Sequence, residues 1–190
     1  LTKLFIEELG WEPCRSSIAL RINESDYTLN AIAEKKGFVA WIYKSSDNTL
    51  PDHNTRLKLD RKLSETSFEH LIVFITNDNA RQSWMWVRRE TGRPLRPRTY
   101  EYQKGQARDS LLQKIQHLYI SLEEEESGIS IALISGRARA AFDVERVTRR
   151  FYERFQREHA VFLNFIKGIP VEDDRAWYAS VMLNRLMFLY

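Results

Sequence analysis

Apolar residues recur at two kinds of spacing along the chain, and these predict its helices and strands. Apolar positions three and four residues apart predict helices over residues 1–10, 27–37, 52–66, 109–122, 143–168 and 172–190. Continuous or alternating runs of aromatic and β-branched residues predict strands over residues 38–44, 70–75, 82–89 and 98–103. Residues 14–22 are expected to be extended or a loop. The turn sequence TNDNAR joins the second and third of these strands, which predicts a hairpin.

The order of these elements predicts an α/β fold in two parts. Strands and helices alternate up to about residue 128, whereas only helical patterns follow from about residue 137. We therefore expect a mixed-sheet α/β module at residues 1–128 and a helical connector at residues 137–190. A chain of 190 residues is long enough for one large domain or two small ones.

The last predicted helix is apolar up to its final residue. The sequence WYASVMLNRLMFLY has no capping glycine, no basic last turn and no polar tail, although helix ends normally need such groups. We expect this chain to be a piece of a longer protein, in which the helix continues or docks on a missing region. In the isolated piece, the side carrying Val181, Leu186 and Leu189 is expected to be exposed and to promote self-association.

Composition excludes several classes of protein and site. No run of apolar residues approaches the roughly 18 that a membrane span requires. The single cysteine, Cys14, excludes an internal disulfide and a cysteine-based zinc site, so a reducing cytoplasm is the expected location. The four histidines have no metal-ligand spacing, and the seven glycines form no phosphate-binding loop.

Positive charge is concentrated in one segment. The net charge is only +3, but residues 81–108 are strongly basic, with Arg81, Arg88, Arg89, Arg93, Arg96, Arg98, Lys104 and Arg108 against Glu90 and Glu101. Arginines neutralise phosphates, and the interspersed Trp84, Trp86, Tyr100 and Tyr102 are of the type that stacks on bases. The alternative is a solvated hairpin whose tryptophans face the core. The segment predicts a nucleic-acid surface formed by Arg81, Arg88, Arg89, Arg93, Arg96, Arg98 and Lys104.

Three sets of residues are candidates for a metal-dependent nuclease site of the PD-(D/E)xK type, in which carboxylates hold a divalent metal and a lysine lies near the attacking water. Asp26, Glu34 and Lys36 match the order of that motif, although residues 27–37 are predicted to be helical. A second match combines Asp52 with Asp60 and Lys62 on one predicted helix. The third is the hairpin of strands 70–75 and 82–89, where Gln82 and Trp84 replace the expected acid and lysine, as in a degenerate site.

Two regions of the chain resemble a known family. EHLIVFITNDNARQSWMWVRRETGRPLRPRTYEYQKGQ, followed by AAFDVERVTRRFYERFQREHAVFLNFIKGI and WYASVMLNRLMFLY, is similar to the N-terminal part of single-chain type IIG restriction–modification enzymes. FDVERVTRRFY and WYASVMLNRLMF are its most specific parts. The resemblance implies a restriction-endonuclease-like module with metal ligands on a strand hairpin, Mg²⁺ as cofactor, double-stranded DNA as partner, and a helical connector to a missing adenine methyltransferase.

S-adenosylmethionine would bind only in that missing methyltransferase region, because the chain contains neither a methyl-donor glycine motif nor an Asn-Pro-Pro-aromatic loop. The expected function of this chain is to contact the DNA backbone and, if its nuclease site is intact, to hydrolyse a phosphodiester with a divalent metal. Two alternatives remain open. One is a non-catalytic module that docks the methyltransferase or a partner subunit, and the other is an RNA-binding regulator.

Overall fold

The computed structural model describes the chain except for residues 90–91, 93, 107, 143–144 and 189–190, and the side chains of residues 145–153 and 187–188. The chain divides into two compact units, Leu1–Asp143 and Val144–Tyr190. We describe each unit by itself.

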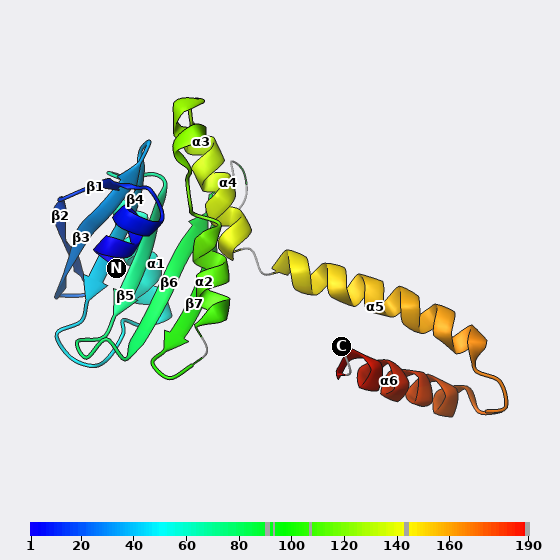
Figure 1. Cartoon of the computed structure of the whole chain (residues 1–190). Coiled ribbons are helices and arrows are strands. Elements are labelled where there is room, and N and C mark those ends of the chain that lie inside the picture. The colour runs from blue at the N-terminus through cyan, green and yellow to red at the C-terminus, as the bar shows by residue number, and fades with distance from the viewer. Residues whose placement is uncertain (90–91, 93, 107, 143–144, 189–190) are drawn as a thin grey trace. The chain divides into compact units, whose positions relative to one another are not determined.

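The first unit is built on a seven-stranded mixed sheet, which confirms the predicted α/β fold (Figure 1). The strands are β1 (Glu12–Pro13), β2 (Ser17–Ile22), β3 (Ser25–Lys35), β4 (Phe38–Lys44), β5 (His70–Ile75), β6 (Arg81–Arg88) and β7 (Arg96–Gln103). Their order is β1-β3-β4-β5-β6-β7, with β2 also paired to β3. Only the pairing of β4 with β5 is parallel among these strands. The predicted hairpin of β5 and β6 is confirmed.

Helices cover both faces of this sheet, because buried residues alternate between the two sides of the central strands. One face packs against helix α1 (His53–Leu63) through Leu59 and Leu63. The other face packs against η1 (Leu4–Glu8), α2 (Asp109–Gln116) and α4 (Ile131–Phe142). The short helix α3 (Leu122–Glu126) lies between α2 and α4 in sequence and begins with a capping box of Ser121 and Glu124.

The helix predicted over residues 27–37 is wrong, because these residues form most of strand β3. Alanine, leucine and charged residues gave the segment a helical pattern, but tertiary pairing overrides such local propensity. β3 pairs with β1 and β2 and also with β4. Its register shifts between Ala31 and Ala33, so three consecutive residues, Ala31 to Ala33, are buried and the alternation typical of a strand is lost.

The beginning of the chain is fixed by residues more than one hundred positions later. The Trp11 indole nitrogen donates a hydrogen bond to the carbonyl of Leu118 at 2.9 Å, and the Ile120 amide donates to the carbonyl of Leu9 at 3.1 Å. Gly10 lies between these contacts with φ at +72°, and a Cβ atom there would lie 2.6 Å from the Ile120 carbonyl oxygen. This close approach requires glycine.

The units divide at residues 143–144, whereas the sequence placed the helical region from residue 137. Helix α4 accounts for the difference, because its residues Ile134, Ala138, Ala141 and Phe142 belong to the core of the first unit. The second unit is a pair of helices, α5 (Glu145–Phe165) and α6 (Glu172–Phe188). Within it, the His159 ring contacts the Ser180 hydroxyl at 3.0 Å. Residue 143, the first of the helix predicted over residues 143–168, lies outside the described residues.

Candidate nucleic-acid interface

Three arginines of the basic segment lie on one face of the β6–β7 hairpin. In its register, Arg88 is opposite Arg96, and Trp86 is opposite Arg98. Alternate residues of a strand point to the same face, so Arg88, Arg96 and Arg98 share the face on which Trp86 packs. Arg88 and Arg98 also interact within the chain. This end of the hairpin therefore carries three arginines on one face.

The structure does not gather the whole basic segment into one surface. Arg81 pairs with Gln103 at the opposite end of the hairpin, seven residues from Arg88 along β6. At about 3.3 Å per residue, this separates the two arginines by roughly 23 Å. Lys104 follows directly after β7 at the end where Arg81 lies. The predicted residue Arg93 lies outside the described residues. The basic segment therefore contributes charge at two ends of the hairpin.

Arg89 is directed inward. Its guanidinium Nη2 lies 2.5 Å from Asp60 Oδ1, and the Arg89 side chain is only 7% exposed. Asp60 Oδ1 also lies 3.0 Å from His70 Nε2, while His70 Nδ1 lies 2.6 Å from the Ser67 carbonyl. Both ring nitrogens of His70 therefore lie next to acceptor oxygens. Arg89 thus belongs to a buried charge cluster, not to an open phosphate-binding surface.

The aromatic residues of the segment are placed mainly in the core. Trp84 and Trp86 are buried in the cluster between the sheet and the α2–α4 side. Tyr100 and Tyr102 are partly buried against the same cluster. Of the two sequence interpretations, the hairpin whose tryptophans face the core agrees with this arrangement. Base stacking on the tryptophan faces is not available in this conformation.

The first candidate catalytic set is not brought together. Asp26 lies near the beginning of β3 and Glu34 near its end, eight residues apart, which is roughly 25 Å along a strand. Lys36 lies in the turn after β3 with φ at +48°. A single metal ion requires ligands within about 2.6 Å of itself, so Asp26 and Glu34 cannot share one in this fold.

The two other candidate sets have structural roles. Asp52 caps α1 by accepting a hydrogen bond from the Thr55 amide at 2.6 Å, and Lys62 donates to the Arg21 carbonyl at 2.7 Å. In the β5–β6 hairpin, the indole nitrogen of Trp84 donates to Gln82 Oε1 at 3.1 Å. Among the residues that the structure describes, no three His, Cys, Asp or Glu side chains form a group that could hold a metal ion.

Sequence reasoning missed a buried lysine that pairs with two carboxylates nearer the surface. Lys35 is 1% exposed, and its Nζ lies 2.6 Å from Glu125 Oε1 and 3.5 Å from Glu12 Oε1. The hydrogen bond from Lys35 holds the pKa of Glu125 below its usual range. The prediction of a helix over residues 27–37 concealed these ion pairs, because a lysine at a helix end is expected to be solvated.

A basic surface on α1 was also missed. Lys58, Arg61 and Lys62 are all exposed, and their spacing of three and four residues sets them on neighbouring turns of the helix. Lys58 Nζ donates to the side chain of Asn23 at 2.9 Å. The spacing is visible in the sequence and was a usable signal. These charges lie on the opposite side of the sheet from Arg88, Arg96 and Arg98.

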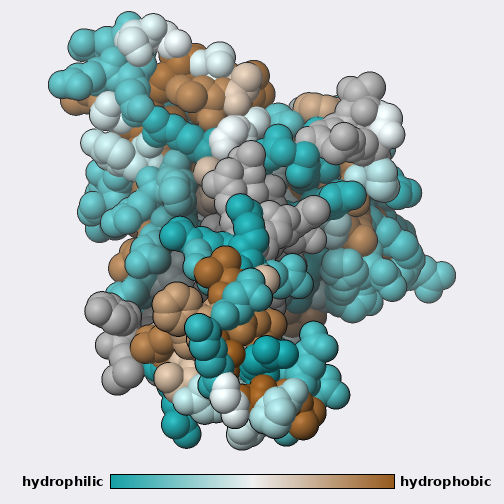
Figure 2. All heavy atoms as spheres, turned by 90° about the vertical axis from the view of Figure 1, so that its right-hand side faces the viewer, coloured by the Kyte–Doolittle hydropathy of each residue, from teal (hydrophilic) through white to brown (hydrophobic). Residues whose placement is uncertain are grey.

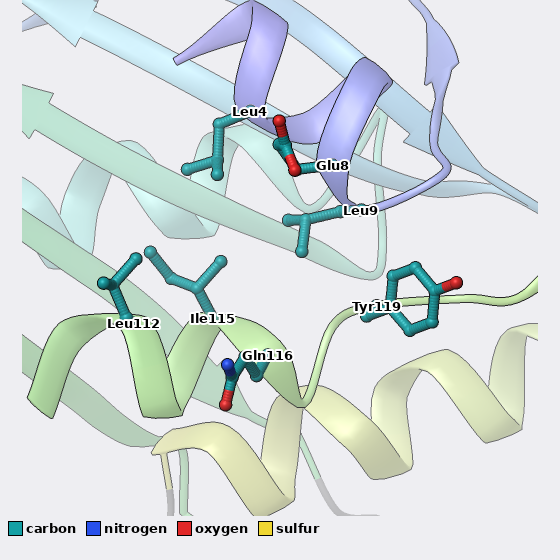
Figure 3. A pocket seen from close by; sticks show the side chains of 7 residues that line it. All are labelled: Leu4, Glu8, Leu9, Leu112, Ile115, Gln116 and Tyr119. Atoms are coloured by element: carbon teal, nitrogen blue, oxygen red, sulfur yellow. The ribbon is translucent and has the colours of Figure 1, made fainter. Parts of the chain in front are cut away.

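A pocket of about 650 Å³ lies between η1 and α2 (Figure 3). Leu4 and Leu9 point toward Leu112 and Ile115 across it. A second pocket of about 500 Å³ shares Leu4, Leu112 and Ile115 with the first. It extends to the β5–β6 turn and to Lys104 and Arg108. Both volumes fall within the range of small-molecule sites.

The acidic residue of the second pocket is already engaged. Asp78 Oδ1 accepts hydrogen bonds from the Thr76 hydroxyl at 2.6 Å and from the Ala80 amide at 3.0 Å. These bonds, with a smaller contribution from the charge of Lys104, hold the pKa of Asp78 below its usual range. The carboxylate is therefore held in its ionised form, and its one negative charge offsets one of the two cations that line this pocket.

None of the helices in the described part of the chain combines the length and apolar character of a membrane span. Comparison of the chain with protein-family models, curated proteins and solved structures finds no match.

Proposed function

We propose that this chain is the N-terminal part of a cytoplasmic type II restriction–modification enzyme and that its sheet module contacts the backbone of double-stranded DNA. The observation that carries the proposal is the opposed pair Arg88 and Arg96, with Arg98 two residues further along the same face. A phosphate bound by both arginines would accept charge-assisted hydrogen bonds from them, for which the guanidinium fork is well suited. Contacts to phosphate carry no base information, so we expect binding to be independent of sequence.

The experiment is a titration of labelled duplex DNA, followed by fluorescence anisotropy at several salt concentrations. Replacing Arg88 and Arg96 by alanine should weaken binding to every duplex and lower the slope of log K against log salt by about 2, since each phosphate contact contributes roughly 0.9. The matched control replaces Arg15 and Arg21, two exposed arginines near the opposite edge of the sheet. If both double variants have the same slope, the proposed face is wrong.

The resemblance also implies cleavage with Mg²⁺, but the candidate residues do not fit one ion. Because Asp26 and Glu34 lie roughly 25 Å apart along β3, we derive no catalytic step through a metal at these residues. The isolated chain is expected to nick plasmid DNA weakly or not at all with Mg²⁺ or Mn²⁺. Strong nicking that Glu34→Ala abolishes would contradict this assignment, whereas strong nicking that survives Glu34→Ala would indicate another site in the chain.

The second candidate function is docking of the methyltransferase region or a partner subunit, and the helical unit favours it. Phe165 is 84% exposed and Trp177 is 69% exposed, and Val161 is also open. Figure 2 shows apolar side chains interrupting the hydrophilic surface of the face that it draws. Leu186 is exposed and Val181 is half-buried, while Leu189 lies outside the described residues. Loss of self-association on extension of the chain past residue 190 would support this role, and unchanged self-association would oppose it.

A further inference from the structure

The polar wall of the second pocket presents donors and cations. Lys104 and Arg108 both line it and are exposed. Within the described part of the chain, neither side chain has an ion-pair partner within 4 Å. The nearby carboxylate of Asp78 is hydrogen-bonded to Thr76 and Ala80. With two cations and one carboxylate, the charged residues that line this wall sum to +1.

Gln82 adds uncharged donors to the same wall. The Trp84 indole N–H can only donate, so the Gln82 atom 3.1 Å from it must be the amide oxygen. This hydrogen bond occupies the side-chain carbonyl and leaves the NH₂ group as the remaining hydrogen-bonding group. With Lys104 and Arg108, it favours a ligand that supplies several acceptor oxygens, as a phosphate does.

The rest of the pocket is apolar. Leu4, Leu111, Leu112 and Ile115 line it, together with the partly buried ring of Tyr102. A free inorganic anion would leave this surface uncovered, whereas a ligand with a flat apolar body next to its anionic group would bury it. A nucleoside 5′-monophosphate has both parts, and its size suits a volume of about 500 Å³.

We propose that this pocket binds a 5′-phosphorylated nucleotide, with the phosphate at Lys104 and Arg108 and the base among the leucines and Tyr102. The proposal rests on the proposed DNA contact, because Gln82 lies on the same strand face as Arg88, six residues or about 20 Å along β6. A DNA strand advances about 3.4 Å per nucleotide. The straight separation of about 20 Å equals about six nucleotides, but α2 and α4 cover Trp84 and Trp86 on the face between the two sites, so a strand that reaches both must be longer.

The experiment compares three versions of one 12-base-pair duplex, with 5′-phosphate, 3′-phosphate or hydroxyl ends. We expect the 5′-phosphate to strengthen binding about tenfold over the hydroxyl end, the effect of one charge-assisted hydrogen bond. The 3′-phosphate has the same charge and should not strengthen binding. Replacing Lys104 and Arg108 by alanine should make the affinities of the 5′-phosphate and hydroxyl duplexes equal, and a tenfold difference that persists in this variant would overturn the assignment.

Competition experiments distinguish a free nucleotide from a DNA strand end as the ligand, and two variants serve as controls. Competition by deoxyadenosine monophosphate supports a free nucleotide as ligand, while a 5′-phosphate increment without such competition supports a strand end. Competition by inorganic phosphate as effective as that by the nucleotide would overturn the nucleotide assignment. The Arg15→Ala, Arg21→Ala control should keep the increment, and Leu112→Glu, at a surface position, should remove it.

Equal affinity for the three duplexes, together with no competition by the nucleotide, would overturn the pocket proposal. Sensitivity of all three duplexes to Arg88→Ala, Arg96→Ala would then still support the proposed DNA contact. The two proposals can therefore fail separately.

Discussion

Arg89 and Arg96 are close in sequence but should respond to substitution in opposite ways. Arg89→Met keeps the apolar stem and removes the charge that pairs with Asp60 at 2.5 Å. Asp60 and His70 are each 1% exposed, so the pair is buried, and removing one partner of a buried ion pair costs about 3–5 kcal/mol. His70 still contacts Asp60 in the variant, which places the expected loss near the lower limit, about 3 kcal/mol. Arg96→Met, at an exposed position, should stay within about 0.5 kcal/mol of the wild type.

Urea unfolding followed by tryptophan fluorescence measures this difference, because Trp11, Trp41, Trp84 and Trp86 are all in the core of the sheet module. The melting temperature of Arg89→Met should fall by about 10 °C, since 1 kcal/mol corresponds to roughly 2–4 °C in a module of this size. DNA affinity, measured where the protein is folded, should fall for Arg96→Met and be unchanged for Arg89→Met.

A double-mutant cycle tests whether the loss comes from the ion pair. Asp60→Asn should also destabilise the protein, and the double variant Asp60→Asn, Arg89→Met should lose less than the sum of the two single losses. Strictly additive losses would show that Arg89 acts through something other than Asp60. If Arg89→Met has the same urea midpoint as the wild type but binds DNA as weakly as Arg96→Met, the inward role assigned to Arg89 is refuted.

Two further predictions concern stability. The hydrogen bond from Lys35 lowers the pKa of Glu125 in the folded protein. The contribution of Glu125 to the free energy of unfolding is therefore complete above its unfolded pKa of about 4.3. It is lost as the pH falls below that value and through the folded pKa. Urea midpoints at pH 7 and pH 3 should therefore differ less for Glu125→Gln than for the wild type, and equal pH sensitivity would contradict the assigned bond. Gly10→Ala should cost at least about 1–2 kcal/mol, because φ is positive and the new Cβ would meet the Ile120 carbonyl; an unchanged thermal midpoint would count against that close approach.

The central part of the fold could be predicted from the sequence because its local signals and its tertiary environment agree. Residues 70–75 are buried on both faces of the sheet, and an uninterrupted apolar run is the expected sequence for such a strand. The turn that follows contains Asn79 at φ +56°, a conformation in which asparagine is enriched. These two signals were sufficient to predict the β5–β6 hairpin.

β3 could not be predicted in the same way. Its bulge places Ala31, Ile32 and Ala33 in the interior one after another, so the alternation of a strand is interrupted and the spacing of apolar residues predicts a helix instead. What makes it a strand is pairing to neighbours on both sides, which is non-local information. The error also affected the candidate site, since the separation of Asp26 from Glu34 follows directly from their positions on one strand.

The inward course of Arg89 could not be predicted for a similar reason. Arg89 follows Arg88 directly in the sequence, so the two residues have the same neighbours and the same local charge. They differ only because successive residues of a strand point to opposite faces of the sheet. Asp60 lies on a helix 29 residues earlier. No local pattern indicates that a carboxylate from that helix reaches the end of β6.

The contacts of Trp11 with Leu118 and of Leu9 with Ile120 have a consequence for synthesis of the chain. While the ribosome is still making residues up to 117, Trp11 can already pack on Phe38 and Phe5 on Trp84, but the carbonyl that accepts from Trp11 and the amide that donates to Leu9 do not yet exist. Closing a loop of this length is entropically costly and contributes to slow folding. At about 5–20 residues per second, synthesis of the residues between Trp11 and Leu118 takes roughly 5–20 s, during which the packing around Leu9 and Trp11 is incomplete.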